Sequence, residues 1–410
     1  MEGIAHSSSE EKTPSNCPSV LFAALATIAL FAGMWSVACV SDFLIVGAGV
    51  AGASAGYFLS EFGSVTLLEM ESAPGYHSTG RSAALFTEYY GNRTVRALTA
   101  ASRSFFTDPP PGFAEDALLA PRGVVALGPV GAEEKFEQVL AAGLTAPDPV
   151  REISPEEVRR HCPVVRDGWY SRAMLKPAAM DIDVDLLHQG YLRGLRARGG
   201  KVVTSARVRN LARLGGVWHA KTDAGEFSAP VVVNAAGAWA DEVASIAGVA
   251  QVGLVPLRRT ALLADPPEGL DAARWPMVAD VTETFYFKPE SGRLLISPMD
   301  ETPAPPGDAR PDDLDVALAV ERVQEATTLV VRSVRHAWAG LRTAVPDDTP
   351  VIGGAPDADG FVWLAGLSGY GVQSSPATGR LAASAATGTP LPAADRPDID
   401  LAEIAPGRQR

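Results

Sequence analysis

The chain has 410 residues, 47% of them hydrophobic and 20% charged, which is the composition of a folded protein long enough for two domains. Its formal net charge of −13 at pH 7 argues against nucleic acid as a partner and favours small-molecule ligands. The isolated cysteines Cys17, Cys39 and Cys162 have no spacing typical of a zinc site, a disulfide framework or a redox dithiol. A reducing, cytoplasmic compartment is therefore expected.

Residues 1–41 form an N-terminal extension. The run from Val20 to Val40 is uncharged and long enough to cross a bilayer, but acidic residues outnumber lysine before it, unlike in a secretory signal. A membrane helix ending at Val40 also leaves almost no linker before the strand predicted next. We therefore interpret 1–41 as an upstream extension or an over-called start. A signal-anchor, with membrane contact through 20–40, is the alternative.

Residues 42–69 predict a dinucleotide-binding βαβ unit. Phe43 to Val46 and Val65 to Leu68 are short apolar runs typical of buried strands, and a helix-like run between them is expected to stop at Gly63. The terminal acid, Glu69, is correctly spaced to accept hydrogen bonds from a ribose.

The turn of this unit has the pattern Gly-x-Gly-x-x-Gly. Gly47 permits a tight turn, Gly49 lets the backbone approach a pyrophosphate, and Gly52 allows the helix to pack closely on the strand. The diphosphate would face the positive end of the helix. The alternative is a glycine-rich turn without a ligand.

The next elements follow in chain order. The segment 72–90 is rich in small residues and suits close approach to a flat ligand, and a helix is expected over 92–106. Ser154 to Glu157 has the pattern of a capping box, and Asp183 or Asp185 begins a helix that runs to Arg198. Strands are expected at 201–203 and 206–210.

The second half returns to the first sheet. Val231 to Val233 is a buried strand entering a glycine turn, and short β-like runs over 254–296 predict a mostly antiparallel region. Helical spacing follows over 313–328. A last strand, 361–365, leads through the glycine turn at 368–373 into a second helix.

The chain from Asp42 to about Pro392 resembles a known family, the flavin-dependent D-amino-acid oxidase and glycine oxidase group, and within it the D-arginine dehydrogenases. The segments that carry the resemblance are 47–54, 74–84, 97–103, 181–183, 187–194, 234–239, 338–342 and 369–373.

The resemblance implies an α/β, α+β two-domain flavoprotein: a Rossmann-like FAD-binding domain with a second, mostly antiparallel β-sheet substrate domain. The order of the predicted strands and helices agrees with this arrangement. The FAD-binding domain is expected to comprise 42–93, 183–253 and 338–395, and the substrate domain 94–182 and 254–337.

The resemblance also implies an enzyme that oxidises an amino acid at its CH–NH bond. The substrate passes a hydride to flavin N5, and the imino acid is hydrolysed to a 2-oxo acid and ammonia. FAD is expected to be noncovalent, since no cysteine lies near the second glycine turn and His77 is interpreted as a loop histidine. The implied FAD-binding residues are Gly47, Gly49, Val50, Ala51, Gly52, Glu69, Ser78, Thr79, Arg81, Ser82, Ala83, Ala84, Val208, Ala236, Gly237, Trp239, Gly340, Gly369, Tyr370, Gly371, Val372 and Gln373.

Carried over by position, Arg342 and Arg259 are the implied clamps for the substrate carboxylate. Tyr286 and Tyr90 would donate hydroxyl hydrogen bonds, and Gly369 would offer its carbonyl to the amine. Two planar guanidinium groups suit a buried carboxylate. The alternatives are an ion pair of Arg342 with a nearby aspartate, a solvated Arg259, and tyrosines that serve only as core aromatics.

The sequence departs from the D-arginine dehydrogenases in the side-chain pocket. Leu85 stands where they have an active-site histidine, and the acid that faces the substrate guanidinium is missing from 121–125, although Glu88 or Glu115 could replace it. A neutral or hydrophobic D-amino acid is therefore expected. Glycine, sarcosine or another secondary amine remains open.

Two other functional classes compete. A nicotinamide-dependent dehydrogenase would share the first βαβ unit but not the segment 78–84, and a noncatalytic flavoprotein subunit of a membrane-associated complex would fit the loss of histidine at Leu85. Retention of the candidate arginines and tyrosines favours an enzyme. The electron acceptor is expected to be a quinone or oxygen, no metal site is expected, and the oligomeric state is not legible.

Overall fold

The computed structural model describes residues 39–145 and 148–408. The uncharged run at 20–40 lies outside these residues except at its end, where Cys39–Val40 form the short strand β1. Within the described part of the chain, no helix is long and apolar enough to cross a membrane.

A six-stranded sheet forms the core of the glycine-motif region, and its parallel strands bring the turns after β2 and β14 to the same edge. Across the sheet the order is β10 (Lys201–Val203), β3 (Val65–Leu68), β2 (Phe43–Val46), β14 (Val231–Asn234), β22 (Phe361–Ala365) and β21 (Val351–Gly354). Of these, β21 runs antiparallel to its neighbour and the others are parallel.

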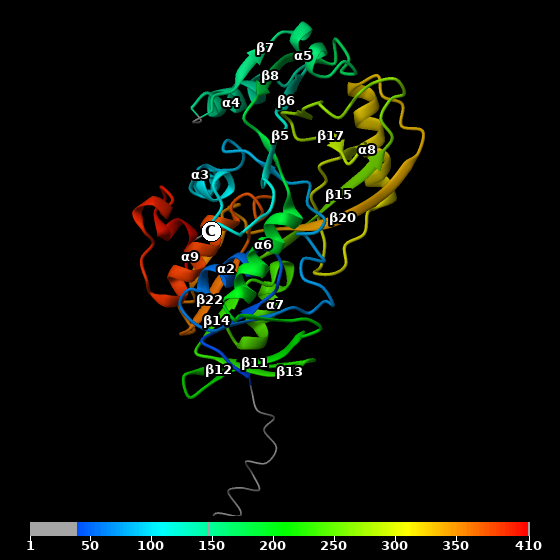
Figure 1. Ribbon diagram of the computed structural model, residues 1–410. Helices are drawn as coiled ribbons and strands as arrows, with labels where there is room; N and C mark the ends of the chain where they lie inside the picture. Colours follow the sequence, from blue (N-terminus) through cyan, green and yellow to red (C-terminus); the bar gives the residue numbers. More distant parts are fainter. Residues whose placement is uncertain (1–38, 146–147, 409–410) are drawn as a thin grey trace, which may run out of the picture. The chain divides into compact units, whose positions relative to one another are not determined.

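Both faces of this sheet are covered, which is why its strands read as continuous apolar runs. Phe43 and Ile45 point into a core made with four helices, whereas Leu44 and Val46 point into a core on the other face. The helices of the first core are α2 (Val50–Leu59), α3 (Arg93–Thr107), α6 (Val184–Ala197) and α9 (Ser375–Thr387). Figure 1 shows α2, α6 and α9 grouped beside β14 and β22.

The second face is closed by a helix and a small antiparallel sheet. The helix is α7 (Ala240–Ala247), which follows the 3-10 turn η1 (Gly237–Trp239). The small sheet has the order β1, β13 (Gly225–Ala229), β12 (Val217–Thr222) and β11 (Val208–Leu214), and β1 joins it as a parallel edge strand. A three-stranded sheet elsewhere pairs β4 (Leu85–Phe86), β9 (Met180–Ile182) and β5 (Leu119–Pro121).

The largest sheet has nine strands and is antiparallel except between β16 and β6. Its order is β19 (Thr302–Pro303), β15 (Val255–Ala264), β18 (Arg293–Ser297), β17 (Tyr286–Glu290), β16 (Met277–Asp280), β6 (Val124–Pro129), β8 (Tyr170–Lys176) and β7 (Arg151–Ile153), with β20 (Val334–Ala344) paired to β15. The predicted mostly antiparallel region is confirmed.

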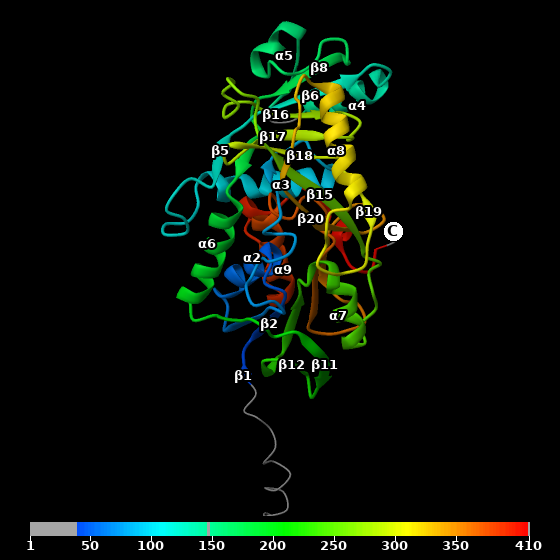
Figure 2. The same cartoon turned by 90° about the vertical axis from the view of Figure 1, so that its right-hand side faces the viewer.

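Three helices accompany the nine-stranded sheet: α4 (Glu133–Leu144), α5 (Pro155–His161) and α8 (Asp313–Ala326). Val323 and Ala319 of α8 pack on Phe285 and Phe287, so one face of the sheet is a closed apolar core. Figure 2 shows α8 along this sheet. Because side chains alternate along a strand, Tyr286 points to the other face, toward the glycine-motif region.

Local helix signals from the sequence are confirmed. Asn92 caps α3 by accepting from the Val95 N–H, and Asp183 caps α6 by accepting from the Leu186 N–H. The capping box of α5 is complete, since the Ser154 and Glu157 side chains each accept from the other's backbone N–H. Capping depends on residues three apart in sequence, which is why it was legible.

Two expected boundaries are wrong. Helix α2 ends at Leu59, and its C-cap is Ser60, three residues before Gly63. Gly63 instead leaves room for the Asp42 side chain, because a Cβ at this position would lie 2.7 Å from an Asp42 carboxylate oxygen. The strand expected at 206–210 begins at Val208 and runs to Leu214, since Ser205 adopts a positive φ of 53° and the Ala206 N–H is used by the Glu69 carbonyl.

The predicted domain boundaries stay a prediction. Strand β20 passes the expected boundary at 338 without a break and pairs with β15 on both sides of it. It reaches η1 at the edge of the six-stranded sheet. The two long strands therefore link the glycine-motif region with the nine-stranded sheet.

Candidate active site

The glycine turn has little room for side chains. Gly47 has φ +99°, and a Cβ there would lie 2.5 Å from the Ala235 carbonyl oxygen. A Cβ on Gly52 would lie 1.8 Å from the Gly47 carbonyl oxygen, so the helix touches the strand end directly. The roles predicted for Gly47 and Gly52 agree with this geometry.

Glu69 holds this turn in place. Its side chain is buried, with Oε2 accepting from the Ala48 N–H and Oε1 from the Glu71 N–H, both at 2.9 Å. A carboxylate can accept about four hydrogen bonds, so capacity for a ribose remains. Contact between Glu69 and a ribose stays a prediction.

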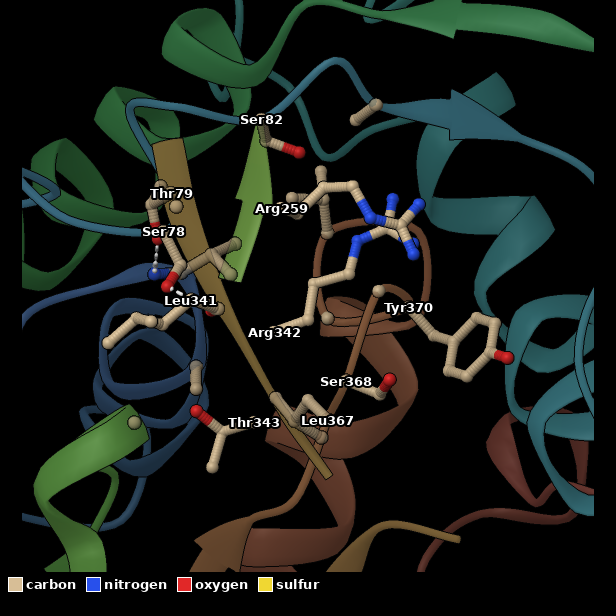
Figure 3. A pocket seen from close by; sticks show the side chains of 18 of the residues that line it. Ser78, Thr79, Ser82, Arg259, Leu341, Arg342, Thr343, Leu367, Ser368 and Tyr370 are labelled. Atoms are coloured by element: carbon tan, nitrogen blue, oxygen red, sulfur yellow. Dashed lines mark hydrogen bonds between the residues drawn. The ribbon is translucent and has the colours of Figure 1, made fainter. Parts of the chain in front are cut away.

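The segment 78–84 is fixed between the glycine turn and β20. The Thr79 hydroxyl accepts from the Val50 N–H at 3.0 Å, and the Ser78 hydroxyl donates to the Leu341 carbonyl at 2.6 Å. Arg81 donates from Nη1 to the Ala339 carbonyl at 2.9 Å and forms an ion pair with Asp308. Figure 3 shows Ser78 and Thr79 beside β20.

One cavity of about 810 Å³ runs along these groups. Every predicted FAD-binding residue lines it except Gly52, which lies beneath the turn against Gly47. The five residues implied for catalysis line it as well. The cavity continues past them to Lys176 and Tyr89 on the nine-stranded sheet side.

Two arginines from neighbouring strands meet inside the cavity. In the ladder of β15 with β20, Arg259 pairs with Gly340 and Arg342 pairs with Leu257, and Figure 3 shows the two guanidinium groups converging. Arg259 is 8% exposed; its Nε donates to the Asp300 carbonyl at 2.8 Å and its Nη2 lies 2.6 Å from Glu301 Oε1. Its Nη1 has no partner among the described residues.

The two arginine charges repel each other inside the cavity. Burial and the neighbouring Arg342 charge lower the pKa of Arg259. Burial also disfavours the charged form of Arg342, but Tyr90 and Tyr286 outweigh that effect, and the pKa of Arg342 is raised. Since both guanidinium groups stay charged in proteins, the site is electrostatically complementary to an anion.

The alternative of an ion pair for Arg342 is not what the geometry favours. Among residues 39–145 and 148–408, no carboxylate lies within salt-bridge distance of Arg342, and Asp347 binds Arg408 with both oxygens, at 2.8 and 3.0 Å. Arg259 is buried and lines the cavity, so it is not a solvated surface residue.

The second glycine turn closes over Arg342. A Cβ on Gly369 would lie 2.8 Å from Arg342 Nη1, so the absence of a side chain there lets the guanidinium occupy its place. The preceding Ser368 has φ +46°. Tyr370 stands edge-on to Tyr90, with ring centroids 5.1 Å apart, and both rings line the cavity.

Two histidines lie near the glycine turn. His188 is buried, with Nε2 2.9 Å from the Ala48 carbonyl oxygen, and burial lowers its pKa. No role was predicted for His188 from the sequence. Its position on the buried face of the predicted helix, with Leu187 and Tyr191, is the one feature of the sequence that indicates a buried contact. His77 lies in a loop as predicted, with Nε2 2.9 Å from Glu71 Oε1.

Comparisons with known proteins give the fold a family. The sequence model of DAO, described as FAD dependent oxidoreductase, matches residues 42–385. The chain belongs to this family. It is an FAD-dependent oxidoreductase.

Several relatives of this oxidoreductase cover most of its length. It is 24% identical to the uncharacterized oxidoreductase YurR of Bacillus subtilis, over 82% of this chain and 92% of that protein. It is also 24% identical to human mitochondrial dimethylglycine dehydrogenase, over 81% of this chain but 41% of that longer protein. Among solved structures, glycine oxidase from Geobacillus kaustophilus superposes with a TM-score of 0.79 at 20% identity, covering 91% of this chain and all of that one.

The residues at the glycine turn fit the FAD of this family. No described residue accepts from the N–H of Gly49 or Ala51 at the start of α2, and both residues line the cavity. Unpaired N–H groups at a helix start bind a diphosphate well. Residues 78–79, 81–84, 340 and 369–373 lie along the rest of the cavity and would hold the flavin. Among the described residues, no cluster is suited to a metal ion.

Proposed function

We propose that this oxidoreductase deaminates a D-amino acid oxidatively, yielding an imino acid that water converts to a 2-oxo acid and ammonia. The observation that carries the proposal is the arginine pair, because two converging guanidinium groups, of which Arg259 is paired with Glu301 and Arg342 with no described carboxylate, match the α-carboxylate of an amino acid. Bound FAD would supply the hydride acceptor.

The chain's own residues would then position the reacting atoms. Arg342 and Arg259 hold the carboxylate, and the hydroxyl groups of Tyr286 and Tyr90 complete its hydrogen bonds. The carbonyl of Gly369 accepts from the substrate amine, which must be neutral to give up a hydride from Cα. Fixing the carboxylate at two points aims the α-hydrogen, and such orientation is worth several kcal/mol.

The D-configuration rests on the resemblance to D-arginine dehydrogenases. Strands β6 and β16 add an apolar wall, Val124, Ala126, Met277 and Ala279, which suits an aliphatic side chain. Reduced cofactor would pass its electrons to a quinone or to oxygen.

A second candidate substrate class is an N-methylated glycine. The likeness to dimethylglycine dehydrogenase favours it, and the same clamp would hold its carboxylate. N-methylated glycines carry methyl groups on the amine and no side chain on Cα, so the two proposals separate in one experiment.

The test is anaerobic reduction of the purified yellow protein by D- and L-amino acids, glycine, sarcosine and dimethylglycine, followed as loss of flavin absorbance. The proposal expects D-amino acids to bleach the flavin fastest. Faster bleaching by sarcosine or dimethylglycine would transfer the assignment to the second class. Bound flavin that no member of the panel reduces would contradict both.

A further inference from the structure

The end of the cavity away from the glycine turn contains a lysine that the sequence did not single out. Lys176 is the last residue of β8, opposite Val124 of β6, which is opposite Met277 of β16. Ala279, two residues further along β16, is opposite Tyr286 of β17. Because side chains alternate across a strand, Lys176 is on the same sheet face as Tyr286, inside the cavity.

Lys176 lies among apolar groups and an aromatic ring. Its Nζ is 4.3 Å from the centroid of the Tyr89 ring, and it has no hydrogen bond or ion pair with any described residue. The Tyr89 hydroxyl is also buried without a partner in this part of the chain. Burial lowers the pKa of Lys176 to about 8, against an upward effect of the exposed Glu283.

Lys288 shows how this fold treats a lysine that has only a structural role. It is buried, whereas Lys176 is half-buried; it lies two residues after Tyr286 on β17, and its Nζ forms ion pairs with Asp181 and Glu290, each at 2.9 Å. A cation without such a partner is unfavourable in an apolar wall. The arrangement at Lys176 is therefore one that a ligand anion would stabilise.

The spacing limits what that ligand is. Lys176 and Tyr286 are separated by three strand-to-strand steps and by two residues along β16, roughly 16 Å between backbones. Side chains reach into this gap from both sides, so the remaining distance suits a short aliphatic chain. The apolar wall between the two ends, Val124, Met277 and Ala279, matches the same chain.

We propose that Lys176 and the Tyr89 hydroxyl bind a carboxylate at the end of the substrate's aliphatic side chain, so that the preferred substrates are dicarboxylic amino acids of the size of glutamate. This inference rests on the proposed amino-acid oxidation and adds the substrate class. The substrate side chain would keep the apolar stem that was predicted from the sequence and would carry a carboxylate at its end.

The first test compares D-glutamate with D-glutamine, its neutral isostere, in anaerobic flavin reduction by the FAD-loaded enzyme. The L-forms are measured in parallel. A carboxylate bound by Lys176 and Tyr89 is expected to favour D-glutamate by roughly 10-fold to 100-fold in the ratio of reduction rate to dissociation constant. Equal use of the two compounds overturns the inference, while reduction by either upholds the proposed function.

The second test uses Lys176→Met, which keeps the stem and removes the charge, with Lys221→Met on the exposed side of β12 as the matched control. Lys176→Met is expected to lose the preference for D-glutamate and to keep the rate with D-glutamine; Lys176→Arg should retain part of the preference. A preference that survives in Lys176→Met, or an equal loss for both substrates, overturns the inference. Flavin content and cooperative thermal unfolding show whether each variant folds.

The two proposals fail in different ways. If D-glutamine or other neutral amino acids bleach the flavin as well as D-glutamate does, amino-acid oxidation stands and the role of Lys176 falls. If no amino acid bleaches it, amino-acid oxidation falls and takes the inference with it.

Discussion

The two ends of the cavity are built on opposite principles. At the glycine turn, Glu69, Thr79 and His188 are hydrogen-bonded to the backbone that they shape, and the free groups there are neutral N–H donors. Away from the turn the free groups include full charges: Arg259 Nη1 and Lys176 have no acceptor among the described residues.

Under the proposed function, this difference separates cofactor binding from substrate binding. At the glycine turn, the side chains of Glu69, Thr79 and His188 form hydrogen bonds with the backbone, so the turn has its conformation before a ligand binds. The arginine end holds like charges close together at a cost to stability, and an anionic ligand relieves that cost. Substitutions at the glycine turn should therefore lower FAD affinity, whereas substitutions at the arginine pair should slow flavin reduction by substrate.

The largest effect is expected at Arg342. Arg342→Met should lower the ratio of flavin reduction rate to substrate dissociation constant on the order of 10³-fold, because a desolvated carboxylate loses its ionic partner. Flavin content should be unchanged. Stopped-flow reduction measures the effect, with Arg335→Met as control, since Arg335 is on the same strand but exposed and paired with Asp265. An equal loss in both variants would contradict a specific clamp.

A smaller effect, of a different kind, is expected at Glu69. Glu69→Gln places an amide NH₂ against one of two backbone N–H donors, and a buried unsatisfied donor costs about 1–3 kcal/mol. FAD affinity should fall about 10-fold to 100-fold, measured by fluorescence titration of the apoprotein. In the protein that still binds FAD, substrate should reduce the flavin at the wild-type rate. Glu61→Gln, at an exposed position, should change neither quantity.

Gly369→Ala tests the contact between the second glycine turn and Arg342. The new methyl group would lie 2.8 Å from Arg342 Nη1, so the guanidinium must move, and reduction of the bound flavin should slow about 10-fold. Gly354→Ala is the control, because nothing lies within 4 Å of a Cβ there. An unchanged rate in Gly369→Ala would show that the position of Arg342 is not critical.

The smallest effect is a gain in stability at Lys176. Because burial lowers the pKa of Lys176 to about 8, the folded protein binds fewer protons there than the unfolded chain between about pH 8 and the ordinary lysine value. The charged form of Lys176 destabilises the folded protein. This destabilisation is complete below about pH 8 and decreases as the pH rises above that value. Lys176→Met should therefore stabilise the protein by roughly 1–3 kcal/mol near pH 7 and by much less near pH 10.

Thermal unfolding of wild type and Lys176→Met at these two pH values checks that sign. Tyr89 and Glu283 are the titratable groups that act on Lys176 in the described structure, and Glu283 partly offsets the burial. A variant that is less stable at neutral pH would mean that Lys176 is a structural cation held by Tyr89.

Local patterns allowed much of the fold to be predicted. Gly47 and Gly52 are required by contacts within one βαβ unit, and the caps at Asn92, Ser154 and Asp183 are set by residues three apart. These features need no knowledge of distant segments. The end of α2 was missed because Ser60 caps it without the glycine that the pattern suggested.

The far end of the site was not legible for the opposite reason. Lys176 enters the cavity only because β8 pairs with β6, and β6 pairs in parallel with β16 from a distant part of the chain. Nothing around Lys176 in sequence marks this register. The arginine pair was predicted through a family resemblance, while the repulsion between its two charges follows only from the pairing of β15 with β20.

The most direct test of the account is the carboxylate requirement of the arginine pair. The measurement is anaerobic flavin reduction by an amino acid that bleaches the flavin and by the α-carboxamide of the same amino acid, in wild type and in Arg342→Met. The account predicts fast reduction by the acid and little by the amide in wild type, with the difference lost in Arg342→Met. Equal reduction by acid and amide in wild type would contradict it.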